Sequence, residues 1–262
     1  MSAIITSIHN CPVKSISFQK LEKCKINKNT GIVGDRVFAF SQNLDLDQSK
    51  EFEKNPEARK GKWNKIVTLK NTPVFNKYNF LYENNKLTLT IKDKEIITIN
   101  VNDSNERDNL VKKLIELEGS LKNDIRLMRN DEHPFYDTSI SNKSMFNNSI
   151  SLININSIRD FENKIDRKIE MSTFRGNLYF DGMEAWEERN WIGKTLKINN
   201  VLFKVEKNIP RCVAINLKPK TDDNSFNLLK ILKQTYNHFD MGIYLTPLED
   251  GEINLLDKIE IN

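Results

Sequence analysis

Cysteine is scarce in this chain, and the cysteines present are poorly spaced for pairing or for a metal cluster. Cys11, Cys24 and Cys212 are the three cysteines among 262 residues, and an odd number at wide spacing is not the pattern of a disulfide framework. No C-x-x-C occurs, which excludes a zinc ribbon and a thioredoxin-type dithiol. An iron–sulfur cluster would need about four cysteine ligands. We therefore expect free thiols in a reducing compartment, and a cytoplasmic location.

The chain also lacks long apolar runs. Its start, "MSAIITSIHN", has no basic segment followed by an apolar stretch, which a secretion signal would require. Nowhere does an apolar run approach the roughly 20 residues that a membrane-spanning helix needs. We therefore expect a soluble protein that does not associate with membranes.

Neither sign of charge is in large excess. There are 40 basic and 36 acidic residues, and the formal net charge is +4. Proteins that bind nucleic acid usually gather their basic residues on one face or segment, whereas here they are spread along the sequence. We expect no nucleic-acid partner.

Several common catalytic and nucleotide-binding motifs are missing. The sequence has no G-x-x-x-x-G-K-[ST], no G-x-G-x-x-G after a strand, no H-E-x-x-H and no G-x-S-x-G. His9, His133 and His238 stand in unrelated contexts, so their spacing supports no histidine metal site. These absences argue against P-loop, Rossmann, zinc-hydrolase and serine-hydrolase functions.

What the sequence does contain is mostly short alternating runs of apolar and polar residues, which predict strands. The predicted strands cover residues 3–9, 36–41, 65–70, 78–83, 86–91, 95–101, 124–130, 150–156, 177–182, 194–199, 201–207, 241–249 and 257–262. Helical spacing predicts helices at 107–119, 157–165 and 225–239, with Ser157 and Asp160 in a capping arrangement for the second. The fold class is therefore mainly β with some helix, a barrel-like α+β architecture.

Four short clusters place a cation next to a strand end. They are "CPVKS" with Lys14, "GIVGDR" with Arg36, "FRGN" with Arg175, and "PRC" with Arg211. Such cations are candidates for one anion-binding site, because arginine and lysine both bind phosphate and carboxylate. A cysteine among them would have a lowered pKa and be a nucleophile or a soft metal ligand. A structural interpretation stays open, since single arginines often form surface ion pairs and single cysteines often fill the core.

Taken in order, these clusters resemble the MOSC family, the molybdenum cofactor sulfurase C-terminal domain proteins. "PVKS" and "GDR" match the β-barrel-like domain that usually precedes MOSC. "FRGNLYFDGMEAWEERNWIG" resembles FRxNhhhDGxxAWxExxWhG, with h apolar, and "RCVAINLKP" resembles RCxxTxVDP. The closing "MGIYLTPLEDGEINLLDKIEI" is similar to FGxYxxVxxxGxIxxGDxV. The resemblance implies an N-terminal β-barrel-like domain at 1–104, packed against a barrel-like MOSC domain at 105–262.

Relatives that reduce amidoximes hold a molybdopterin cofactor, and the resemblance implies the same cofactor here. Cys212 would be the molybdenum ligand and the catalytic residue. The residues implied in cofactor binding are Lys14, Ser15, Arg36, Arg175, Asn177, Arg211 and Tyr244.

The implied function is an oxidoreductase that reduces small N-hydroxylated substrates, with electrons from a separate protein such as a ferredoxin or a reductase. Two alternatives stay open. One is a sulfur carrier or transferase that uses a Cys212 persulfide, and the other is a carrier of the cofactor without catalysis.

The chain departs from the family pattern at three positions. Ile215 and Lys218 replace the threonine and aspartate of RCxxTxVDP, which removes a hydroxyl and an acid near Cys212. Leu256 replaces a glycine in the closing motif. We expect that exchange to be tolerated if the turn does not need a positive φ.

Overall fold

The computed structural model describes residues 3–16, 18–121, 124–136 and 148–261, and the chain divides into two compact units. The first unit takes Met1–Asn10, Lys20–Val33 and Asn148–Asn262, and the second takes Cys11–Gln19 and Gly34–Asn147. These units are defined by contacts within the folded chain, whereas the predicted division follows the boundaries of family domains. The division into 1–104 and 105–262 therefore stays a prediction.

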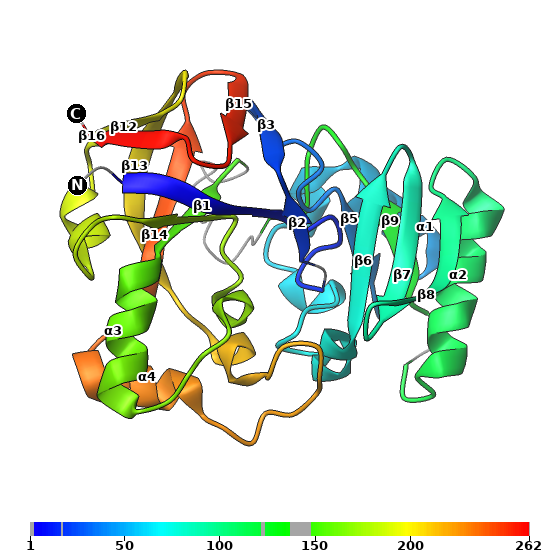
Figure 1. The fold of residues 1–262 in the computed structure, drawn as a ribbon. Coiled ribbons are helices and arrows are strands. Elements are labelled where there is room, and N and C mark those ends of the chain that lie inside the picture. The colour runs from blue at the N-terminus through cyan, green and yellow to red at the C-terminus, as the bar shows by residue number, and fades with distance from the viewer. Residues whose placement is uncertain (1–2, 17, 122–123, 137–147, 262) are drawn as a thin grey trace. The chain divides into compact units, whose positions relative to one another are not determined.

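In the described part of the first unit, seven strands close into a barrel (Figure 1). Their order is β11-β10-β14-β13-β12-β16-β1, and β1 pairs again with β11. β10 and β11 are parallel, and the other neighbouring strands of the barrel are antiparallel. The strands are β1 (Ala3–Asn10), β10 (Ile150–Asn154), β11 (Leu178–Asp181), β12 (Thr195–Ile198), β13 (Val201–Pro210), β14 (Asp240–Pro247) and β16 (Lys258–Ile261).

The barrel interior is the main apolar core of the first unit. Alternate residues of a strand point to one face, and on β1 this buries Ile5 completely while Ile4 and Thr6 stay partly exposed. Phe180 of β11 packs with its ring centroid 5.2 Å from that of Trp191, and both side chains are buried. Such burial provides most of the stability of a closed sheet.

Further elements complete the first unit. β2 (Gln19–Leu21) extends the barrel sheet beside β1, and a separate sheet joins β15 (Gly251–Asn254), β3 (Lys23–Asn27) and β4 (Gly31–Ile32). Its helices are α3 (Ile155–Ile165) and α4 (Leu228–Tyr236), with 3₁₀ turns η5 (Met171–Phe174), η6 (Glu187–Trp191) and η7 (Val213–Asn216). The side chains of Asn154 and Asn227 cap α3 and α4 by accepting backbone N–H bonds.

The second unit contains a three-stranded meander, a strand pair and two helices. The meander is β6 (Tyr78–Glu83), β7 (Lys86–Ile91) and β8 (Lys94–Asn100), and the pair is β5 (Phe38–Ser41) with β9 (Arg126–Arg129). Its helices are α1 (Leu46–Lys54) and α2 (Ser104–Leu117), with 3₁₀ turns η1 (Pro56–Arg59), η2 (Trp63–Lys65) and η3 (Pro73–Lys77). α2 buries Leu110, Val111 and Leu114, whereas Leu117, which the helical spacing places on the same face as Leu110 and Leu114, is exposed.

The expected fold class is confirmed, two local predictions are wrong, and the condition set for Leu256 is not met. Residues 65–70 form no strand, and Ile66 makes an isolated bridge to Ser41 instead. Ser157 does not cap α3, because its hydroxyl donates to the buried carboxylate of Glu188. Leu256 has a φ of 69°, so its turn does require the left-handed conformation, which costs a non-glycine residue free energy.

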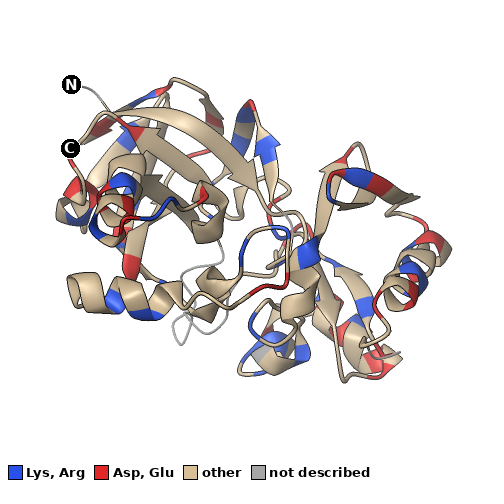
Figure 2. Ribbon diagram, turned by 60° about the horizontal axis from the view of Figure 1, so that its bottom comes forward, with Lys and Arg blue, Asp and Glu red and all other residues tan. Residues whose placement is uncertain are grey.

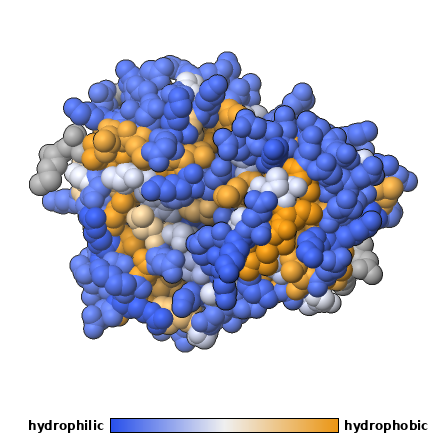
Figure 3. All heavy atoms as spheres, turned by 45° about the vertical axis from the view of Figure 1, so that its right-hand side comes forward, coloured by the Kyte–Doolittle hydropathy of each residue, from blue (hydrophilic) through white to orange (hydrophobic). Residues whose placement is uncertain are grey.

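The surface is mixed in charge and polarity. Lys and Arg alternate with Asp and Glu along the ribbon of each unit (Figure 2). On the face drawn in Figure 3, hydrophilic side chains surround smaller apolar areas. None of the described helices is long and apolar enough to cross a bilayer.

Candidate functional site

Cys212 lies where β13 leaves the barrel. The register of β13 against β14 shifts between Val205 and Lys207 and again between Asn208 and Pro210, and such bulges bend a strand and redirect its end. Cys212 then takes the N-cap position of η7 without a capping bond from its side chain, and its thiol is exposed. The local backbone therefore presents the thiol to solvent instead of burying it.

The Arg211 side chain joins the end of β13 to two other segments. Its Nε donates to the carbonyl oxygen of Met241 at 2.9 Å, and Nη2 donates to the same oxygen. Nη1 donates to the carbonyl oxygen of Phe174 at 2.6 Å. The guanidinium is thus part of the framework that holds the loop before Cys212.

The charge of Arg211 also affects the groups around it. Burial lowers the pKa of Arg211, and Tyr244, Tyr179 and Cys212 act in the opposite direction. These three groups therefore lie within electrostatic reach of the guanidinium. The arrangement places the Arg211 guanidinium within electrostatic reach of the cysteine, while its hydrogen bonds go to the Phe174 and Met241 carbonyl oxygens.

The hydroxyl of a buried tyrosine, Tyr179, forms hydrogen bonds that hold the loop carrying Arg175. The Tyr179 hydroxyl accepts a bond from the Gly176 N–H at 2.9 Å and donates to the Met171 carbonyl oxygen at 2.9 Å. Burial raises the pKa of Tyr179 to about 12, and both Arg175 and Arg211 oppose that shift. A Cβ at Gly176 would lie 2.6 Å from Ile153 Cδ1. Only glycine lets the loop approach the strand this closely.

Asn177 is buried and bonded on both sides within the barrel. Its Oδ1 accepts from the Ser151 hydroxyl at 2.8 Å, and its Nδ2 donates to the His9 carbonyl oxygen at 3.3 Å. The backbone N–H of Asn177 donates to the Ser151 hydroxyl as well. The side chain therefore ties β1 and β10 together where the Arg175 loop enters β11.

Tyr244 lies on β14, opposite Ser151 of β10. It is half-buried, whereas its neighbours Ile243 and Leu245 point into the core. Arg175, Arg211, Cys212 and Tyr244 are thus linked through their electrostatic contacts with Tyr179 and with one another. Four of the predicted residues form one cluster in the first unit.

The predicted residues of the second unit form a group of their own. The Arg36 N–H donates to the Cys11 carbonyl oxygen at 2.7 Å, and the Lys14 N–H donates to the Phe38 carbonyl oxygen at 2.8 Å. These bonds bring "CPVKS" alongside "GDR", so Lys14 and Ser15 lie near Arg36 within this unit.

The buried carboxylate of Asp35 bonds to both segments of that group. It is 1% exposed, accepts the Cys11 N–H at 2.6 Å through Oδ1, and forms an ion pair with Arg36 through Oδ2. Arg36 also lies 5.4 Å from the ring centroid of Tyr136. Burial raises the pKa of Tyr136, the charge of Asp35 adds to that shift, and Arg36 opposes it.

Three predicted residues have left-handed backbone. Ser15, Arg36 and Arg175 have φ angles of 65°, 56° and 50°. Non-glycine residues in this region are strained and are concentrated at binding and catalytic sites. Their conformation supports the interpretation of these loops as functional.

Sequence reasoning missed two supporting residues. Tyr179 and Asp35 both stand inside quoted motifs, "FRGNLYF" and "GDR", but their roles depend on burial. The only signal for these two roles in the sequence was the position of each residue inside a motif that resembles a family pattern.

Comparisons with known proteins agree with part of this picture. Residues 136–260 match the family model of the MOSC domain. A segment of 72 residues is 36% identical to the mitochondrial amidoxime reducing component 2 of Rattus norvegicus, and it covers 28% of this chain and 21% of that protein. The predicted resemblance to the MOSC family is confirmed over the matched residues.

Two bacterial proteins are among the solved structures that align with this chain. The YUAD protein from Bacillus subtilis aligns over 100% of this chain and 96% of its own, with a TM-score of 0.44 and 11% identity. YiiM from Geobacillus stearothermophilus aligns over 43% of this chain and 53% of its own, with a TM-score of 0.35 and 18% identity.

Proposed function

Starting from the match of residues 136–260 to the MOSC domain, we propose that this protein is an oxidoreductase that binds a molybdenum cofactor and reduces small N-hydroxylated compounds. One observation carries the proposal. The matched segment exposes Cys212 in a cluster that contains a retained arginine, a tyrosine and a second arginine on a strained loop.

The residues present fit the chemistry of such a cofactor. An exposed cysteine beside cations is the kind of soft ligand that molybdenum accepts. Among the described residues, no cluster of three or more His, Cys, Asp or Glu side chains could hold a bare metal ion. A pterin dithiolene brings its own sulfur ligands, and the two-electron chemistry belongs to the cofactor when it is bound.

We assign the protein side chains distinct roles. Cys212 is the ligand to the metal, and Arg175 and Tyr244 bind the anionic and polar parts of the cofactor. Arg211 and Asn177 hold these groups in place, through the carbonyl oxygens of Phe174 and Met241 and through the barrel strands. Such supporting bonds fix the residues that touch the metal centre.

We propose separately that Lys14, Ser15 and Arg36 of the second unit bind an anionic group such as a phosphate. The left-handed backbone of Ser15 and Arg36, and the backbone bonds that bring the two segments together, support it. Lysine and arginine are the usual partners of phosphate oxygens in proteins.

The proposed reaction removes the oxygen of an N–OH group as water. It consumes two electrons and two protons and leaves the N–H compound. The electrons come from a separate electron-transfer protein of the ferredoxin or reductase class.

Metal and pterin analysis tests the proposal directly. The protein is purified from a host that makes the cofactor, beside the Cys212→Ala and Cys24→Ala variants. We expect near-stoichiometric molybdenum and pterin in the native protein and in Cys24→Ala, because Cys24 is buried in the core. Cys212→Ala should lose the metal or show a changed metal spectrum.

The same experiment separates the alternatives. Absence of both metal and pterin, with a persulfide on Cys212, would favour sulfur transfer. Full occupancy without reduction of any N-hydroxylated compound by a chemical reductant would favour a carrier. Full occupancy and activity in Cys212→Ala would overturn the assignment of the ligand.

A further inference from the structure

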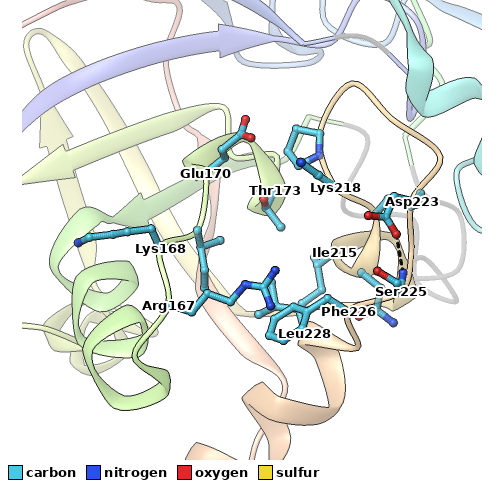
Figure 4. Close-up of a pocket in the computed structure, with 14 residues that line it drawn as sticks. Arg167, Lys168, Glu170, Thr173, Ile215, Lys218, Asp223, Ser225, Phe226 and Leu228 are labelled. Atoms are coloured by element: carbon cyan, nitrogen blue, oxygen red, sulfur yellow. Dashed lines mark hydrogen bonds between the residues drawn. The ribbon is translucent and has the colours of Figure 1, made fainter.

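A pocket of about 210 Å³ lies within the first unit, between η5, η7 and the segment that leads into α4 (Figure 4). Its floor is apolar, and Ile215, Leu217 and Leu228 are each less than 5% exposed. Ile215 stands where the MOSC pattern has threonine, which makes this floor more apolar than the pattern predicts. The pocket therefore suits an aliphatic group.

A cation forms one wall of the pocket. The Arg167 guanidinium lies over the Phe226 ring, with Cζ 3.7 Å from the ring centroid. Stacking holds the guanidinium flat and leaves its N–H groups for other partners. No residue in the described ranges accepts a hydrogen bond from this side chain. Such an oriented guanidinium matches the two oxygens of a carboxylate.

An anion lies on the other side. Asp223 accepts the Ser225 N–H at 2.9 Å through Oδ1, and Figure 4 shows its carboxylate across the pocket from Arg167. Bonds from Ser225 lower the pKa of Asp223, and the charges of Lys218 and Arg167 lower it further. Asp223 and Arg167 form no ion pair with each other. Two opposite charges therefore line the same pocket.

Lys168 offers a contrast on the same wall. Its Nζ pairs with Glu162 Oε2 at 3.0 Å, and the side chain points away from the pocket (Figure 4). It is therefore a matched control for Arg167, adjacent in sequence and equal in charge.

We propose that this pocket binds a zwitterionic α-amino acid with an aliphatic side chain. The carboxylate meets Arg167, the ammonium meets Asp223, and the side chain packs on Ile215 and Leu228. A plain carboxylate would meet repulsion from Asp223, and a plain amine would meet repulsion from Arg167. None of the assigned cofactor ligands lines this pocket, and the proposal does not rest on the redox function.

Calorimetry or protein-observed NMR on the full chain tests the site, with L-leucine as the probe. Isocaproate keeps the carboxylate and the side chain without the ammonium, and isoamylamine keeps the ammonium without the carboxylate. We expect leucine to bind with a Kd of about 1 mM or tighter and each analogue at least about tenfold more weakly.

Three variants locate the binding. Arg167→Gln and Asp223→Asn should each weaken leucine binding about tenfold or more, a loss of roughly 1.4 kcal/mol, and Lys168→Gln should leave it unchanged. Isocaproate binding as tightly as leucine would overturn the zwitterion assignment. No leucine binding, or binding that survives Arg167→Gln, would overturn the site itself.

Discussion

In the first unit a partly buried cation holds the candidate loops together, whereas in the second unit a buried anion does so. Arg211 donates to the carbonyl oxygens of Phe174 and Met241. Asp35 accepts from the Cys11 N–H and pairs with Arg36. Both groups join segments that are distant in sequence, but they differ in the charge that remains for a ligand.

The difference concerns how much positive charge each unit offers. Carbonyl dipoles oppose the Arg211 charge only in part, so the Cys212 cluster keeps a net cation. Arg36 instead faces a full negative charge at contact distance, which offsets most of its field beyond that pair. The first unit therefore leaves more positive charge near its candidate site, whereas the second unit uses its anion to orient an arginine.

The largest expected effect is on the second unit. Asp35→Asn keeps the shape of the side chain but removes the charge that Arg36 pairs with, and breaking such a buried pair should cost about 3 kcal/mol. Hydrogen exchange of the β5 and β9 amides measures this loss. Unchanged protection there, relative to the β10 and β14 amides, would contradict the role given to Asp35.

Removing the partly buried cation of the first unit is the corresponding experiment. Arg211→Met keeps the aliphatic bulk but leaves the Phe174 and Met241 carbonyl oxygens without their donor, at a cost of about 2–3 kcal/mol. Exchange should rise in β14 and not in β5. Equal loosening of both units would show that the two supports are not separate.

Gly176→Ala tests the support of the Arg175 loop without touching any charge. The added Cβ would clash with Ile153 and Tyr179, so we expect about 2 kcal/mol of destabilisation in chemical denaturation. Gly119→Ala is the control, because nothing lies within 4 Å of a Cβ there. A loss in the control equal to that in Gly176→Ala would sink the packing argument.

Acid should weaken the first unit in particular. Burial lowers the pKa of His9 from 6.5 to about 4, and Lys20 lowers it further. The unfolded chain then binds more protons than the folded chain between these values, so the free energy of unfolding falls as the pH drops through this window. The contribution is about 1–2 kcal/mol. His9→Gln should flatten the pH dependence of unfolding, and an unchanged slope would assign it to other groups.

The smallest expected change in stability comes from a substitution that involves no charged group. Leu256 is 71% exposed and has a φ of 69°, so Leu256→Gly should relieve strain and raise stability by about 1 kcal/mol or less. Thermal unfolding measures the gain. A loss of stability would mean that the exposed leucine packs in a way its exposure does not indicate.

Sequence patterns predicted the strands that bury one face. They failed for a segment whose side chains are buried but whose backbone pairs with no neighbouring strand. Residues 65–70 alternate as a strand does, and Val67 and Leu69 are buried, but the segment makes no ladder. α1 was missed because its apolar content is low. Its capping box, in which Asp45 and Gln48 bond each other's backbone, was the readable signal.

The motifs predicted which residues form the candidate site, but not how each is used. Arg211 and Asn177 were expected to face a cofactor, and their side chains bond backbone and strand groups in this structure. Those partners lie 26 to 168 positions away in the chain. Local spacing cannot report contacts of that range, which arise only when the barrel closes.

The closure of the barrel by β1 also determines when it can form during synthesis. β1 is made first, yet it pairs with β11 and β16, which are made much later. Most of the second unit, residues 34–147, is translated between β1 and these partner strands. It can therefore begin to fold before β1 has a strand to pair with. A fragment limited to the matched residues 136–260 would leave β11 and β16 as open edges, which invite aggregation. Folding of the barrel is therefore expected to be slow, as long-range pairing generally is.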